Sequence, residues 1–329
     1  MSKTLQLKES HYRPGKKDLW RGRQDEPEAP RFHKIATCQD LSKEIHTAHG
    51  ITWGILGFAC DEGVKRNQGR IGAAQGPEAI RRSLAHLPFN PQKNMRIYDF
   101  GDITCADGDL EKAQHYLGEA VSFLLSKNIR PIVLGGGHET AWGNYQGIAA
   151  AYPAKDLGIV NFDSHFDLRP LLEGGKGSSG TSFTQIAQAR REAKLKFDYC
   201  CLGIQSTGNT KGIFKNAEDL NVKTLLADEF HEAGTEASIE MIEEIKTRND
   251  LIYASICLDV FAAPFAPGVS SPQPLGLFPW HILPALRRLA ATGKVVSLDL
   301  VELCPPFDRD DTTAKLAAAL ISNFIHYSN

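Results

Sequence analysis

The sequence lacks the features by which several classes of protein are recognised. Its 37 Lys and Arg residues are balanced by 39 Asp and Glu residues, so no cationic excess favours nucleic acid as a partner. It contains no run of about 18 apolar residues, the length that a membrane-spanning helix needs. The N-terminal segment up to Pro30 is polar throughout and has no apolar stretch typical of a secretory signal. We therefore expect an ordinary soluble globular protein that has neither nucleic acid nor a membrane as its partner.

Cysteine is also scarce, and its spacing is irregular. The seven cysteines are odd in number and form no CxxC pair, which argues against a disulfide framework. Free thiols are typical of a reducing compartment, so we expect a cytoplasmic protein.

Short apolar runs rich in β-branched residues alternate with helical patterns after about residue 50. Runs that are apolar on both faces are typical of parallel strands covered by helices. Eight such repeats predict an α/β domain over residues 51–329, either an open doubly wound sheet or a (β/α)8 barrel. We expect residues 1–50 to form an extension that packs on this domain. The predicted strands lie at residues 51–59, 95–103, 130–136, 157–163, 197–205, 222–228, 251–261 and 294–303.

Polar residues at the carboxyl ends of parallel strands are the first candidates for function. The segment GGGHE follows one predicted strand and places His138 and Glu139 at the start of a helix. Its glycines match no phosphate-binding motif. They allow a close approach of the backbone, which would present His138 at the end of the sheet. Alone, His138 could equally be a helix-start histidine that bonds to the backbone.

A second cluster, NFDSHFD, follows another apolar run. Asp163, His165 and Asp167 alternate, so in extended geometry the three side chains leave the same face. Burying two carboxylates beside an imidazole is unfavourable unless a cation neutralises them. A solvated turn is the alternative, but the flanking Phe162 and Phe166 fit it badly. Asp and His together suit Mn, Fe or Zn, so the pattern predicts a metal site.

The stretch SICLDVFAAPFAPGVSSP repeats this alternation. Cys257 and Asp259 stand two residues apart where a predicted strand meets a loop rich in Pro and Gly. Taken singly, Cys257 would be a buried core thiol. Six candidate ligands are too many for one open catalytic ion and suit two ions that share ligands. The six are His138, Asp163, His165, Asp167, Cys257 and Asp259.

The segments GGGHE, NFDSHFD and SxCxDxxxxxxxPG, in this order, resemble the ureohydrolase family of arginases, agmatinases and formimidoylglutamases. The resemblance covers roughly residues 50–329. It implies a three-layer arginase-like α/β sandwich, a mostly parallel eight-stranded sheet and a pair of Mn ions. Five of the six candidates match the family's ligands. The exception is Cys257, which stands where most members carry a bridging aspartate; a thiolate is softer and better matched to Zn or Fe.

Other segments are similar to the formimidoylglutamase branch, namely WRGRQD, DEGVKRNQGRIGAAQGPEAIRRSL, DLRP and SSGTSF. Arginases and agmatinases carry a histidine at the position of Ser179, which counts against arginine or agmatine. The resemblance implies hydrolysis of N-formimidoyl-L-glutamate to L-glutamate and formamide, in a homo-oligomer. The alternatives are another guanidino or amidine acid, such as guanidinobutyrate, and a metal-poor relative without activity.

Catalytic and substrate-binding roles can be expected for a few further residues. A water activated by two ions would attack the amidine carbon, and Asp167 or Asp259 could accept its proton. Glu302 matches the family's substrate-pairing glutamate and would bond to the amidine nitrogens. An acidic substrate needs cationic partners, of which Arg169 is the first candidate. The secondary candidates are Arg70, Ser179 and Thr181.

Overall fold

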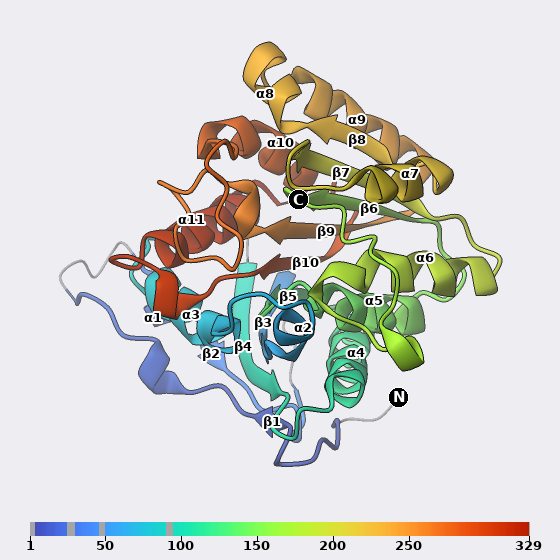
Figure 1. Cartoon of the computed structure of the whole chain (residues 1–329). Helices are drawn as coiled ribbons and strands as arrows, with labels where there is room; N and C mark the ends of the chain where they lie inside the picture. The colour runs from blue at the N-terminus through green and yellow to red at the C-terminus, as the bar shows by residue number, and fades with distance from the viewer. Residues whose placement is uncertain (1–3, 25–29, 46–49, 90–94, 329) are drawn as a thin grey trace.

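The fold was analysed in a computed structural model, which describes residues 4–24, 30–45, 50–89 and 95–328 (Figure 1). Parts of the predicted extension, residues 1–3, 25–29 and 46–49, lie outside this description, as does Asn329. No helix in the described ranges combines the length and the apolar character needed to cross a bilayer.

The described strands form one open sheet, in the order β1-β4-β3-β5-β10-β9-β6-β7-β8, with β2 paired to β4. The pairs are parallel, except that β1 runs antiparallel to β4. The barrel alternative is therefore wrong and the open sheet is confirmed. The strand bounds are β1 Tyr12–Arg13, β2 Thr37–Cys38, β3 Ile51–Ala59, β4 Met95–Thr104, β5 Arg130–Leu134, β6 Leu157–Phe162, β7 Asp198–Ile204, β8 Lys223–Leu226, β9 Leu251–Cys257 and β10 Val295–Val301.

The eight predicted strands correspond to β3–β10, and the count of eight was too low by two. The two additional strands, β1 and β2, come from the N-terminal segment. Each has only two residues, so no apolar alternation could reveal it. The predicted strands also ran too far at several carboxyl ends: β9 ends at Cys257, and residues Leu258–Val260 form a 3₁₀ turn.

Helices cover both faces of the sheet and give three layers, as the family resemblance implies (Figure 1). One face packs against α4 (Leu110–Ser126), α5 (Thr140–Ala151), α6 (Ser182–Glu192) and α7 (Lys211–Asp219). The other face packs against α3 (Gly76–Ala85), α8 (Ala227–Ala233), α9 (Glu236–Arg248), α10 (Pro279–Ala291) and α11 (Thr312–Tyr327). Apolar side chains that alternate along each strand point into these two cores in turn, so the sheet is packed tightly on both faces.

The N-terminal segment is attached to the edge of the sheet by buried polar contacts. The Trp20 indole donates to Asp99 Oδ2 at 2.8 Å, and the Tyr12 hydroxyl donates to the carbonyl of Phe100 at 2.9 Å. Asp99 is neutralised by the fully buried Arg81, which also pairs with Asp102. Because these groups are withdrawn from water, their pairing offsets the free energy lost by removing the charges from solvent.

Candidate metal centre and catalytic cavity

The candidate site residues follow four strands that are adjacent in the sheet. His138 follows β5, Asp163 follows β6, Cys257 ends β9 and Glu302 follows β10. The order β5-β10-β9-β6 places these carboxyl ends side by side, at the centre of the sheet. Side chains that are far apart in the sequence therefore meet at one edge, as expected for parallel sheets.

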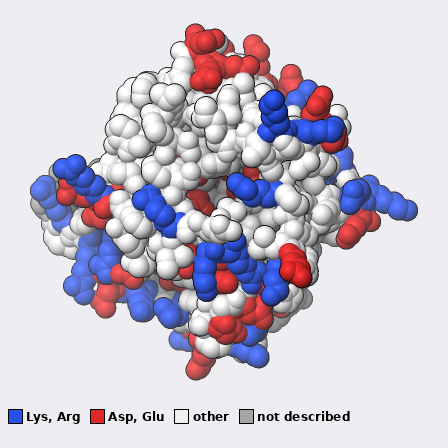
Figure 2. Space-filling model, in the orientation of Figure 1, with Lys and Arg blue, Asp and Glu red and all other residues white. Residues whose placement is uncertain are grey.

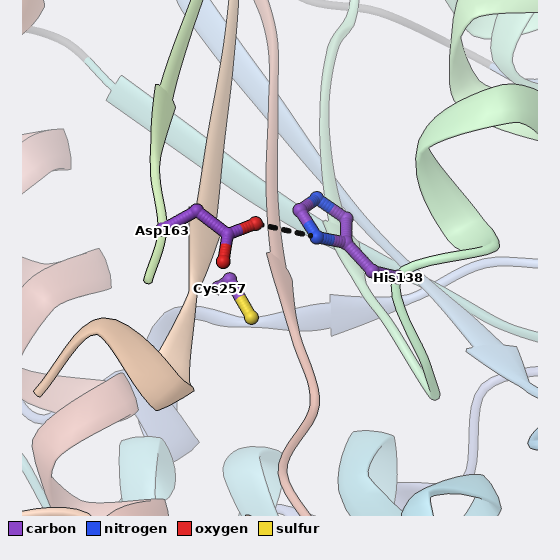
Figure 3. A group of neighbouring side chains, drawn as sticks. All are labelled: His138, Asp163 and Cys257. Atoms are coloured by element: carbon purple, nitrogen blue, oxygen red, sulfur yellow. Dashed lines mark ion pairs between the residues drawn. The ribbon is translucent and has the colours of Figure 1, made fainter. Parts of the chain in front are cut away.

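The first group of donors is His138, Asp163 and Cys257, whose ligand atoms all lie within 4.8 Å of one another (Figure 3). His138 Nδ1 lies 3.0 Å from Asp163 Oδ2 and 2.8 Å from an oxygen of Asp167. Neither oxygen is placed to form a hydrogen bond with this buried nitrogen. An imidazole nitrogen and carboxylate oxygens gathered in this way fit a shared cation.

The second group is Asp163, His165 and Asp259, again within 4.8 Å. His165 Nδ1 lies 3.2 Å from Asp259 Oδ2 and 3.7 Å from Asp163 Oδ1. Asp163 thus belongs to both groups, with one oxygen directed toward each. A carboxylate shared in this way is the arrangement that two neighbouring ions require.

The six predicted ligands come together, although the geometric reason given from the sequence was wrong. β6 ends at Phe162, and the chain bends at Ser164 and His165 instead of continuing as a strand. Asp167 then adopts a left-handed backbone with φ 50°. Asp259 likewise lies in a 3₁₀ turn and not on the strand that carries Cys257. The ligands converge because the chain turns at the strand ends.

A buried hydrogen-bond network orients His138. Its Nε2 lies 3.0 Å from the Ser255 hydroxyl, which donates to Asp299 Oδ1 at 2.6 Å. Since this hydroxyl proton goes to Asp299, Ser255 accepts from His138 Nε2–H. In the neutral imidazole, the form that binds a metal, Nδ1 is then the unprotonated nitrogen. Asp299 also accepts from Asn144 Nδ2 at 2.9 Å and from the Tyr253 hydroxyl. All members of this network are buried.

Burial and mutual repulsion disfavour the negative charges of the centre. They raise the pKa of Asp163 to about 7, through burial first and then the charge of Asp259. Burial, followed by the charge of Asp163, raises the pKa of the Cys257 thiol well above its ordinary value. Burial also raises the pKa of Glu302, with a further contribution from Glu139. A bound dication would reverse these penalties, which is a second reason why the donors suit a metal.

Five of the six donors line a cavity of about 320 Å³, namely His138, His165, Asp167, Cys257 and Asp259. Figure 2 shows a hollow on this face, with acidic side chains at depth and basic side chains beside it. The polar lining includes residues that the sequence analysis did not single out. These residues lie in loops, and the only sequence signal that could have identified them is that they are close in the chain to residues that were predicted. They are Asn67, Gln68, Asn209, Thr210, Ser270 and Ser271.

The two predicted arginines line the cavity in different ways. Arg169 is exposed, and no side chain among the described residues pairs with its guanidinium group. Arg70 instead donates to the carbonyls of Val269 and Ser270, and it stacks on Phe307 at 4.1 Å. Arg169 is therefore available to a ligand, whereas Arg70 holds two loops together.

Ser179 and Thr181 lie beside the cavity, outside the set of described residues that line it. The Thr181 hydroxyl accepts from the amide of Ser178 at 2.8 Å and lies 3.1 Å from Gln185 Oε1. The carbonyl of Gly180 accepts from the amide of Arg169 at 3.0 Å. This segment therefore supports the backbone of Arg169 and is not aimed at the cavity.

Glu302 combines a strained backbone with a position at the cavity wall. Its φ is 70°, which is unusual for a residue other than glycine, asparagine or aspartate. Its Oε1 accepts from the amide of His138 at 2.8 Å. The turn after β10 thus ties Glu302 to the loop that carries His138, and Glu302 itself lines the cavity.

Comparisons with known proteins agree with this geometry. The model of the arginase family matches residues 51–326. A formimidoylglutamase of Legionella pneumophila (strain Paris) is 44% identical over 316 residues, which is 96% of this chain and 98% of the relative. One from Geobacillus thermodenitrificans is 42% identical over 312 residues, 94% of this chain and 95% of the relative.

Solved structures of arginase-family proteins also match this chain. The formiminoglutamase of Trypanosoma cruzi, crystallised with Mn²⁺, matches with a TM-score of 0.76 and 25% identity, covering 91% of this chain and 98% of that one. The formimidoylglutamase of Bacillus subtilis shares the fold, with a TM-score of 0.80 at 23% identity, covering 92% of this chain and 93% of that one.

Proposed function

This chain belongs to the arginase family, and we propose that it hydrolyses N-formimidoyl-L-glutamate to L-glutamate and formamide. The observation that carries the proposal is a pair of donor groups that share Asp163 and lie against a cavity, whose lining includes an arginine that no described side chain pairs with. Relatives at 39–44% identity over most of the chain are formimidoylglutamases, which supports the choice of substrate.

Two Mn²⁺ ions fit the donor set. His138, Asp163, Asp167 and Cys257 would hold one ion, and Asp163, His165 and Asp259 would hold the other. When bound, the pair supplies a nucleophile from water at neutral pH and polarises the amidine. The soft thiolate of Cys257 is the least suited of these ligands to Mn²⁺.

The protein's own groups would bind the substrate at both ends. Arg169 would grip the substrate carboxylate through its planar fork of donors. Oε2 of Glu302 would accept a hydrogen bond from the formimidoyl nitrogen, and Oε1 remains fixed by the amide of His138. The reacting carbon is then held over the donor groups, which converts a bimolecular attack into an oriented one.

Asp167 is the better placed of the two candidate general bases. Asp259 is engaged through both oxygens, because Oδ1 accepts from the Ser164 hydroxyl at 2.8 Å and Oδ2 faces His165. Asp167 lines the cavity and approaches His138 through Oδ2 alone. Asp167 would take the proton of the attacking water and pass it to the leaving amine of glutamate as the C–N bond breaks.

A hydrolysis assay after Mn²⁺ loading tests the proposal. We expect release of glutamate from N-formimidoyl-L-glutamate and no turnover of arginine or agmatine. Equal or faster turnover of guanidinobutyrate would move the assignment to that acid, which Arg169 could also bind. The absence of hydrolysis with both ions bound would favour a non-catalytic relative.

The variant Arg169→Leu separates substrate binding from chemistry. It should raise KM for the formimidoyl substrate by about 10- to 100-fold, because a charge-assisted contact contributes about 1.5–3 kcal/mol. Arg82→Leu is the control, since Arg82 is exposed and, among the described residues, pairs with Glu78 on its own helix. An unchanged KM in Arg169→Leu would show that Arg169 does not bind the substrate carboxylate.

A further inference from the structure

Two thiols outside the metal centre lie next to each other at neighbouring strand ends. Cys60 follows β3 and Cys105 follows β4, directly after the paired residues Ala59 and Thr104. Both pack against the same apolar core, so both lie on one face of the sheet. Neighbouring strands are about 4.8 Å apart. This spacing lies within the range of about 4.4–6.8 Å that separates the Cα atoms of a disulfide.

The two thiols differ in exposure and acidity. Cys60 is buried, whereas Cys105 is half-buried. Their direct interaction lowers the pKa of Cys105. The same interaction, together with burial, raises the pKa of Cys60 far above its ordinary value. Cys105 is the only one of the seven cysteines whose pKa is lowered. A half-buried thiol with a lowered pKa thus stands against a buried partner, the arrangement expected of an oxidisable pair.

Cys60 also contacts the loop that carries His138. Its carbonyl accepts from the amide of Gly137 at 3.1 Å. Gly136 passes so close that a Cβ at this position would overlap the same carbonyl oxygen. The thiol of Cys60 interacts with the buried carboxylate of Glu139. Any displacement of Cys60 would therefore reach the residues on both sides of His138.

We propose that Cys105 and Cys60 form a redox-responsive pair, which a peroxide converts to a disulfide and whose closure weakens metal binding at His138. The metal-binding part rests on the proposed function; the disulfide does not. The Cα spacing permits the bond, but side chains at adjacent positions of neighbouring strands leave in parallel, so the two side chains and their local backbone must turn toward each other for the disulfide to close. A disulfide formed under such strain is readily reduced again, which suits regulation.

The chemistry balances with hydrogen peroxide as the oxidant. The thiolate of Cys105 attacks one peroxide oxygen, the O–O bond breaks, and a proton completes the departing water, leaving a sulfenic acid. The sulfur of Cys60 then attacks the sulfur of Cys105. The S–S bond forms, the S–O bond breaks, and the hydroxyl group leaves as a second water with the proton of Cys60. The two thiols lose two electrons and the peroxide gains them.

Peptide mapping of the full-length Mn²⁺-loaded protein tests the disulfide. After treatment with peroxide and alkylation, we expect a loss of two hydrogen atoms, a peptide that joins Cys60 to Cys105, and reversal by dithiothreitol. Cys105→Ser should form no such product, and Cys60→Ser should accumulate a sulfenic acid at Cys105. Cys38→Ser, a change at another half-buried thiol, should behave as the unmodified protein. Oxidation of other cysteines in place of this pair would overturn the proposal. If Cys60→Ser does not fold, the comparison of Cys105→Ser with the unmodified protein is sufficient to test the disulfide.

Elemental analysis after oxidation and gel filtration tests the link to the metal. The oxidised protein should lose Mn²⁺, and Cys105→Ser treated in the same way should keep it. A disulfide with full metal retention would refute the coupling. If the reduced, metal-loaded protein fails to hydrolyse the formimidoyl substrate, the proposed function is wrong. The mass and metal measurements do not depend on activity, so they still test the disulfide and its effect on metal binding.

Discussion

Removal of the Ser255 hydroxyl tests whether the buried network selects the metal-binding form of His138. In Ser255→Ala, the Nε2–H of His138 loses its acceptor, and Asp299 loses one of its donors. The imidazole can then rotate or change tautomer, so that Nδ1 no longer faces Asp163. Loss of such an outer contact typically weakens metal binding by about 10- to 100-fold, equivalent to about 1.4–2.8 kcal/mol.

Stability has to be separated from metal affinity in this experiment. Leaving buried polar groups unpaired costs about 1–3 kcal/mol in the free energy of unfolding, whatever their role. Ser238→Ala is the matched control, because Ser238 is equally buried and its hydroxyl donates to the carbonyl of Thr235, in the turn before α9. It should lower stability and leave metal affinity unchanged.

The measurement is the Mn²⁺ dissociation constant, obtained by competition with a chelator. We expect weaker binding in Ser255→Ala, partial recovery in Ser255→Thr, which keeps a hydroxyl, and no change in Ser238→Ala. Unaltered Mn²⁺ affinity in Ser255→Ala, or an equal loss in the control, would refute the reasoning that this hydroxyl orients His138.

Further predictions concern the thiols, the glycine loop and the metal. Cys257→Asp replaces a soft ligand by a hard one, and Mn²⁺ should bind more tightly by on the order of tenfold, measured by the same competition. Gly136→Ala would force a Cβ into the carbonyl of Cys60, so we expect a lower Tm and loss of metal binding; an unchanged Tm would contradict that packing. Chelation of Mn²⁺ should lower the Tm, because binding at about 100 times Kd stabilises by about 2.7 kcal/mol, and an unchanged Tm on chelation would argue against bound metal. A lowered pKa leaves more thiolate at neutral pH, so iodoacetamide should modify Cys105 faster than Cys38, whose pKa burial raises to about 11; equal rates would argue against the lowered value.

The strands were largely predictable because their signal is local. β3 was predicted with its observed bounds, Ile51–Ala59, since an apolar run bounded by polar residues specifies a buried strand by itself. The order of strands was not predictable from periodicity, because it depends on contacts between distant segments. The same limit hid β1 and β2, which exist only through pairing with β4.

The sequence singled out the side chains that the structure brings together as candidate ligands, and it did not single out the residues that support them. Asp163, His165 and Asp259 stood out because charged residues are rare beside buried strands. Ser255 gave no such signal, since a serine inside a strand is ordinary, although it lies two residues before Cys257. The role of Arg70 depends on carbonyl groups that no sequence pattern marks.

The position of β10 has a consequence for how the protein acquires its metal. This strand is the last in the chain, yet it lies between β5 and β9 at the centre of the sheet. Before it inserts, no strand pairing joins β3, β4 and β5 on one side to β6, β7, β8 and β9 on the other. His138 belongs to the first half, and Asp163 and Cys257 belong to the second. A nascent chain that has not yet released β10 would therefore hold the two halves of the candidate metal centre apart, so the metal binding that we propose would have to follow the insertion of this strand.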